Sequence, residues 1–250
     1  MGNSSSGEFE MHKLAEFAIN AHGGLVRWKT YRSVSADLVQ GGGFWGLKGK
    51  AGALERVNVK ADLTREWASH SPFLASDQRS IFEPPQRVAI EKKDGTVVQE
   101  LLSPRDSFKG HTLETHWNDL QLAYFVGCAM WTYLNTPFLL AMPGVGAEEL
   151  EPWKERGETW RRLKVNFPPS IVTHSTVQTL YFDQRGLLKR HDYDVEIAGG
   201  TSGAHYVDDF VEVSGILFPT KRRIFPRQPD GKSLSEPLVI SIDLDDIRLI

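Results

Sequence analysis

Residues 120–147 read LQLAYFVGCAMWTYLNTPFLLAMPGVGA and contain no charged side chain, although charged residues make up 24% of this 250-residue chain. An apolar block of this length is buried either in a lipid bilayer or inside folded protein. Gly127, Asn135 and Pro137 interrupt the block, whereas a helix that spans a bilayer needs roughly 20 predominantly apolar residues in succession. We therefore expect no transmembrane segment. The block instead predicts a helical insert, at about residues 117–142, that lies in a concave surface formed by the rest of the chain.

The sequence on both sides of this block has the alternation of half-buried antiparallel strands. Val57 and Val59 alternate with polar neighbours, and Leu163 and Val165 do the same. Turn-forming pairs separate such runs at Asp94-Gly95, Arg156-Gly157, Arg185-Gly186, Ser214-Gly215 and Asp230-Gly231. Five hairpins predict about ten strands, and an antiparallel sheet of that size curls. The expected fold is mainly β (α+β): a curved antiparallel sheet or half-barrel with an N-terminal helix and the helical insert in its concave face.

The N-terminal region predicts a helix that follows a short unstructured head. Apolar residues recur at helical spacing after Phe9, and Gly23-Gly24 ends the pattern as C-terminal glycines do. We expect residues 1–8 to be a disordered head and residues 9–250 to form a single domain. Residues 1–6, MGNSSS, also match the pattern for N-myristoylation. If the source is eukaryotic, an acyl chain on Gly2 would give a weak membrane anchor.

Composition excludes several classes of protein. A net charge of −3, from 29 basic and 32 acidic residues, gives no basic surface for nucleic acid, and we interpret Lys221-Arg222-Arg223 as a solvated strand face. The chain has one cysteine, Cys128, and no basic, apolar leader at its start, which favours a cytoplasmic location. It has no metal-ligand motif: His111 and His116 stand five residues apart, which is wrong for one helical face. We therefore expect no metal and no cofactor.

Four polar residues are candidates for catalysis. Alternation places His191 and Tyr193 on one face of the strand-like run 189–197, and His205 and Asp209 on one face of the run 205–213. If the two runs pair, all four side chains converge on the concave wall. A buried histidine beside an aspartate is a workable general base, and Tyr193 could donate to a developing oxyanion. The alternative is that these inward polar groups only bond to one another or to water.

Aromatic residues near the insert are candidates for binding a hydrophobic ligand. They are rich in ring surface and a few polar groups stand among them, as in small-molecule sites: Trp117, Tyr124, Trp131, Tyr133 and Phe138, with His116 at the mouth of the pocket. The alternative is that the rings only pack in the core.

The N-terminal helix with Ala21-His22-Gly23-Gly24-Leu25, Trp28 and the strand entry at Ser33-Val34 resembles the opening of lipoprotein-carrier-like proteins, the LolA/LolB superfamily. The resemblance implies a half-barrel lidded by helices, with a hydrophobic cavity for acyl chains. Our first hypothesis is a protein that binds a hydrophobic small molecule in the concave face. The second is a cofactor-independent enzyme, an isomerase, cyclase or hydrolase, that acts on a hydrophobic metabolite such as a secondary metabolite through the His/Asp/Tyr set.

Overall fold

The computed structural model describes residues 11–250, so the predictions for the head and for Gly2 lie outside the described residues. The strands of the first half of the sheet are β1 (Ser33–Gly41), β2 (Arg56–Asp62), β3 (Ala68–Ser71), β4 (Gln78–Glu83), β5 (Arg87–Lys92) and β6 (Val97–Leu102). Those of the second half are β7 (Gly146–Glu155), β8 (Glu158–Asn166), β9 (Val177–Phe182), β10 (Leu188–Val195), β11 (Thr201–Val213), β12 (Ile216–Pro226) and β13 (Ile240–Leu249). The α-helices are α1 (Lys13–Ala21), α2 (Leu25–Trp28), α3 (Phe44–Leu47) and α4 (Asp119–Asn135), and short 3-10 helices are η1 (Pro104–Phe108), η2 (Phe138–Ala141) and η3 (Glu196–Ala198).

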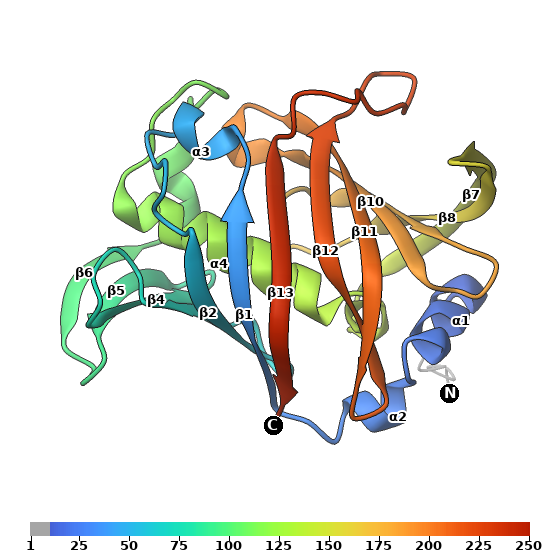
Figure 1. Ribbon diagram of the computed structural model, residues 1–250, viewed down its shortest axis with the longest axis horizontal. Coiled ribbons are helices and arrows are strands. Elements are labelled where there is room, and N and C mark those ends of the chain that lie inside the picture. The colour runs from blue at the N-terminus through green and yellow to red at the C-terminus, as the bar shows by residue number, and fades with distance from the viewer. Residues whose placement is uncertain (1–10) are drawn as a thin grey trace, which may run out of the picture.

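The thirteen strands form one antiparallel sheet in the order β6-β5-β4-β3-β2-β1-β13-β12-β11-β10-β9-β8-β7. Within each half every strand pairs with its neighbours in sequence, and the pairing of β1 with β13 joins the two halves. The edges β6 and β7 do not pair, so the sheet is a curved, unclosed half-barrel. Figure 1 shows α4 crossing behind β1, β13 and β12, on the concave side of this sheet.

The predicted fold class is confirmed, with thirteen strands in place of about ten. Two of the strands that the alternation pattern does not reveal are β3 and β4. The first three residues of β3 are buried in succession, as are Ser80, Ile81 and Phe82 in β4. Because these strands are covered on both faces, they lack the period of two that marks a half-buried strand.

The insert helix α4 has clear start and stop signals. The Asn118 side chain accepts a hydrogen bond from the Gln121 N–H, and the Gln121 side chain accepts one from the Asn118 N–H, which is a reciprocal capping arrangement. The helix ends at Asn135, before an extended Thr136, because Pro137 disfavours helical geometry in the residue that precedes it. Every residue from 121 to 135 is buried. Within residues 11–250, no helix is both long and apolar enough to cross a membrane.

Close packing of α4 against the sheet depends on Gly127. A β-carbon built on Gly127 would lie 2.2 Å from Cβ of Phe82 in β4. Any larger side chain at position 127 must therefore push α4 away from the sheet.

We expect Gly127→Ala to destabilise the protein by about 1 kcal/mol, because an overpacking cost of about 2 kcal/mol exceeds the roughly 1 kcal/mol that alanine gains in a helix. The matched control is Gly46→Ala in α3, where an added β-carbon meets nothing within 4 Å. Urea denaturation of the two variants and the parent measures both effects. Equal stability of Gly127→Ala and the parent would contradict the close contact with Phe82.

Candidate functional site

A cluster of polar side chains lies between α4 and the strands β10, β11 and β12. His191 in β10 stands directly opposite His205 in β11, and Tyr193 lies two residues further along β10. Arg222 comes from β12 and Tyr133 from α4. The exposed fraction of each of these side chains is 3% or less, so the cluster is sealed from solvent.

Hydrogen bonds connect the cluster through the Tyr133 hydroxyl. This oxygen is 2.5 Å from the Tyr193 hydroxyl and 3.1 Å from Nε2 of His174. His174 also stacks on the Tyr193 ring, with 4.6 Å between ring centroids. His191 Nε2 lies 2.5 Å from Oε1 of Gln178 in β9. The three buried imidazoles are thus held in place by phenol and amide groups.

Arg222 is the cation of the cluster. Its Nη2 donates to the carbonyl oxygen of Tyr133 at 3.1 Å, and its Nη1 is 3.5 Å from His205 Nε2. Among residues 11–250, no carboxylate lies within 4.0 Å of the Arg222 guanidinium. Burial lowers the pKa of Arg222 to about 10, which leaves it charged at neutral pH.

The histidines of the cluster are neutral. Burial, and secondarily neighbouring positive charge, lowers the pKa of His174 and of His191 to about 3. Burial and the charge of Arg222 also hold the pKa of His205 well below 6.5, and burial raises the pKa of Tyr193. The cluster therefore presents one cation and several neutral donors and acceptors.

Asp209 does not join this cluster, so the prediction that it lies beside His205 is wrong. Asp209 has a φ of 54°, and this left-handed geometry interrupts the alternation of β11. Phe210 then packs against the core in its place. The Asp209 carboxylate instead pairs with Lys221 at 2.5 Å, and its side chain is 57% exposed. His205 consequently has no carboxylate to orient it.

The residues expected to bind ligand are dispersed along the insert. Of this set, Tyr133 reaches the polar cluster. Trp131 donates to the carbonyl oxygens of Asp62 and Arg65 at 3.0 and 2.9 Å, so its ring closes the core beside the turn that joins β2 to β3. The other rings pack within the core: Phe138 stacks on Trp28, Tyr124 meets Phe82 edge to face, and Trp117 packs at a tilt against Phe125. His116 is exposed, beside Gly49.

Three residues of the site escape the sequence analysis: Arg222, His174 and Gln178. Arg222 belongs to the Lys221-Arg222-Arg223 triplet, and the interpretation of that triplet as a solvated face is wrong for its middle residue. Arg222 is 1% exposed. Its alternation with Ile224, which is also buried, is the signal that places it on the inner face. His174 lies in a loop, where alternation gives no information.

A segment that we call the strap, residues 167–176 between β8 and β9, lies over α4 and carries His174. The Val172 N–H donates to both carboxylate oxygens of Glu66 at 3.0 and 3.1 Å. The guanidinium of Arg105 donates to the Thr173 carbonyl oxygen at 3.2 Å and also pairs with Glu196. Beneath the strap, Cys128 Sγ lies 3.7 Å from the carbonyl oxygen of Val172. Burial raises the pKa of Glu66 to about 8.

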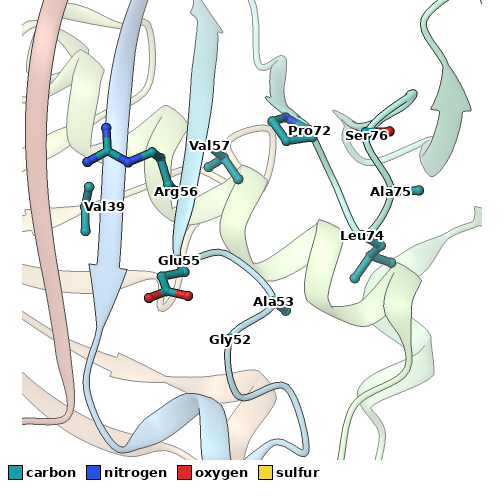
Figure 2. A pocket seen from close by; sticks show the side chains of 10 residues that line it. All are labelled: Val39, Gly52, Ala53, Glu55, Arg56, Val57, Pro72, Leu74, Ala75 and Ser76. Atoms are coloured by element: carbon teal, nitrogen blue, oxygen red, sulfur yellow. The ribbon is translucent and has the colours of Figure 1, made fainter.

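Hollows on the surface lie away from the cluster. The hollow in Figure 2 has a volume of about 600 Å³ and lies between the β1–β2 pair and residues 72–76. Its wall residues Val39 and Arg56 pair across β1 and β2 and point away from α4. Two smaller hollows, of about 480 and 180 Å³, both include Ile171 of the strap. Within residues 11–250, no group of three or more His, Cys, Asp or Glu side chains is arranged to hold a metal ion.

Solved structures share this arrangement of strands and helices. A DUF1329 family protein from Desulfovibrio piger superposes with a TM-score of 0.56 at 10% sequence identity, over 94% of this chain and 91% of that one. A putative outer membrane lipoprotein-sorting protein domain from Vibrio parahaemolyticus superposes with a TM-score of 0.52 at 11% identity, over 95% of this chain and 91% of that one. The chain has a LolA-like fold.

A LolA superfamily protein from Nitrosomonas europaea also superposes, with a TM-score of 0.48 at 12% identity, over 90% of this chain and 91% of that one. No protein-family model and no curated protein sequence matches the chain. The superpositions on the Desulfovibrio piger and Vibrio parahaemolyticus structures confirm, for the fold, the resemblance stated from the N-terminal helix.

We expect the protein to lose stability as the pH falls below 6.5. Burial holds the pKa below 6.5 in each of the five buried histidines, His22, His70, His174, His191 and His205. The unfolded chain binds these protons near pH 6.5 and the folded chain does not, so acid favours unfolding. The free energy of unfolding then falls by up to about 1.4 kcal/mol per pH unit for each histidine.

Urea denaturation between pH 5 and 7 measures this slope. We expect His191→Gln to reduce the slope, and the control His116→Gln, outside the buried set, to leave it unchanged. A profile that is flat between pH 5 and 7 would contradict the burial of neutral imidazoles.

We also expect the strap to open without unfolding of the whole domain. Cys128 is the only cysteine of the chain, so its rate of reaction with a disulfide reagent reports exposure beneath the strap. Glu66→Ala combined with Arg105→Ala should raise this rate at least tenfold, whereas the control Arg161→Ala, which breaks an exposed pair with Glu149, should not. Local opening gives a rate that is insensitive to low urea. Local opening would be refuted if the reaction rate increased from the lowest urea concentration onward and to the same extent in all variants.

Proposed function

We propose that this protein binds a hydrophobic small molecule between α4, the strap and the inner face of β10–β12. The observation that carries the proposal is a set of fully buried polar atoms without a hydrogen-bond partner around α4: Arg222 Nε, His174 Nδ1 and Thr132 Oγ1. More than nine-tenths of buried polar groups in proteins are paired with protein or ordered water. Two of these side chains, Arg222 and His174, both bond to Tyr133, and unpartnered atoms this close together favour a site that completes its bonds with a bound molecule.

The surroundings of these atoms suit a molecule that is mainly apolar. Val207 and Ile224 are buried on the inner faces of β11 and β12, and Val172 of the strap lies against Cys128 of α4. Apolar walls with a few convergent polar groups are characteristic of small-molecule sites. The solved structure from Vibrio parahaemolyticus is named as a putative outer membrane lipoprotein-sorting domain, and a lipid-like cargo is consistent with that name.

Access to the site requires movement, because α4 and the strap fill the concave face. His174 lies on Tyr193 and bonds to Tyr133, so displacement of the strap would uncover both hydroxyl groups. The strap is held by polar contacts at Glu66 and Arg105, by the Glu196 N–H, which donates to the His174 carbonyl oxygen, and by the Asp194 N–H, which donates to Ser175 Oγ. Local opening of such a segment costs less free energy than unfolding of the core.

Binding is favoured over catalysis by the geometry of His205. A general base at neutral pH needs a pKa near the working pH and a partner that orients it. Burial holds the pKa of His205 well below 6.5, and the expected partner Asp209 lies on the exposed side. The enzyme hypothesis thus lacks the dyad on which it depends.

The test uses protein purified from its own host and then freed of ligand by solvent extraction. We expect native mass spectrometry of the purified protein to show a mass excess that denaturation removes. The extracted protein should bind the uncharged fluorophore N-phenyl-1-naphthylamine at one site. Val207→Phe, which adds bulk opposite Arg222 in the register of β11 and β12, should weaken this binding at least tenfold.

The matched control is Val177→Phe in β9, where the side chain is 46% exposed; it should leave binding unchanged. Val207→Ala tests whether any substitution at this position disrupts folding and binding. It removes bulk where Val207→Phe adds it, and it should bind the fluorophore within threefold of the parent. Absence of both a mass excess and fluorophore binding in the parent protein would refute the proposal.

A further inference from the structure

Two arginines of this protein are almost completely buried, and their surroundings differ. Arg190 is 0% exposed and points to the outer face of β10. Its Nε donates to Asp192 at 2.6 Å and its Nη1 to Glu155 at 2.8 Å. The chain therefore supplies two carboxylates to the buried cation on its outer face, as burial of a charge requires.

Arg222 on the inner face is buried to the same degree, at 1% exposure, without such a partner. The carboxylates of β10, which lies beyond β11 from β12, are committed elsewhere: Asp192 bonds to Arg190, and Asp194 pairs with Arg227 at 2.7 Å. The groups that face Arg222 are His205, the ring of Tyr133 at 5.2 Å and the carbonyl oxygen of Tyr133. All of them are uncharged.

We propose that Arg222 receives the acidic head group of the bound molecule, so that the ligand is a hydrophobic carboxylic acid. This inference rests on the proposed function, whose ligand class it names. The Nε–H of Arg222 has no partner, and Nη2 uses one of its two hydrogens for Tyr133. Nε and Nη2 are the two parallel donors that a carboxylate accepts in a bidentate pair.

A monoanion suits this cluster better than a phosphate. The negative charge has a single cation to meet, since the surrounding histidines are neutral. The hydroxyl groups of Tyr133 and Tyr193, 2.5 Å apart, are the additional donors next to it. A phosphate monoester would bring a second charge and a third acceptor oxygen for which the cluster has no further cation.

The experiment compares two fluorescent probes, 11-(dansylamino)undecanoic acid and its methyl ester, at pH 7.5. We expect the parent protein to bind the acid at least tenfold more tightly than the ester. Arg222→Gln should abolish this preference and leave the affinity for the ester within threefold. Arg222→Lys, which keeps the charge and loses the fork of donors, should retain part of the preference. The control Arg156→Gln, at an exposed pair with Asp208, should behave as the parent.

Displacement of the acid probe by dodecanoate but not by dodecyl phosphate would support a carboxylate head group, and stronger displacement by the phosphate would overturn that assignment. Equal affinity of the parent for acid and ester, or an unchanged preference in Arg222→Gln, would refute the role of Arg222. The proposed function would still be supported in that case, because the protein binds the ester. Absence of binding of both probes to the parent would refute the proposed function and this inference together.

Discussion

Burial of α4 on every side is the constraint on which the rest of the structure depends. Fifteen consecutive residues, 121–135, are buried, so this helix has no face for solvent. One face of a flat sheet covers only one side of a helix. The sheet therefore curves around α4, and the remaining surface is closed by the turn between β2 and β3, which accepts bonds from Trp131, and by the strap, which covers Cys128. The curvature of the sheet and the strap therefore serve the same purpose, which is to bury the insert helix on every side.

The same enclosure explains why the polar cluster is unusual in energetic terms. Enclosing a helix with apolar residues alone would satisfy the hydrophobic requirement, and replacing a buried ionic group with apolar side chains is often neutral or stabilising. The inner face nevertheless carries Arg222 with three neutral histidines. On the outer face the buried Arg190 is balanced by Asp192 and Glu155. The contrast between the two arginines within one sheet is the observation from which we infer a ligand that carries the missing charge.

Much of the architecture could be predicted because its signals are local. The uncharged block located the insert, and alternation in two strands brought His191, Tyr193 and His205 together, since both strands keep their period up to those residues. Asp209 was misplaced because a positive φ at that residue reverses the faces, which a period of two does not reveal. Arg222 was missed because a charged residue in a basic triplet is expected on a solvated face. Its alternation with the apolar Ile224 indicates the inner face instead. His174 and the strap depend on contacts between residues far apart in sequence, such as Glu66 with Val172, and no local pattern encodes them.

The distribution of contacts also decides which part of the molecule moves when a ligand enters. The helix α4 is fixed by its capping arrangement at Asn118, by the contact of Gly127 with Phe82 and by the two bonds of Trp131. Displacing it would expose a largely apolar surface. The strap is held mainly by polar contacts, at Glu66, at Arg105 and at the backbone bond from Glu196 to His174, and its release separates His174 from the two tyrosine hydroxyls. Because displacement of the strap uncovers the polar end of the site, the proposed ligand would reach Arg222 with its acidic head from the strap side and leave its apolar part along α4.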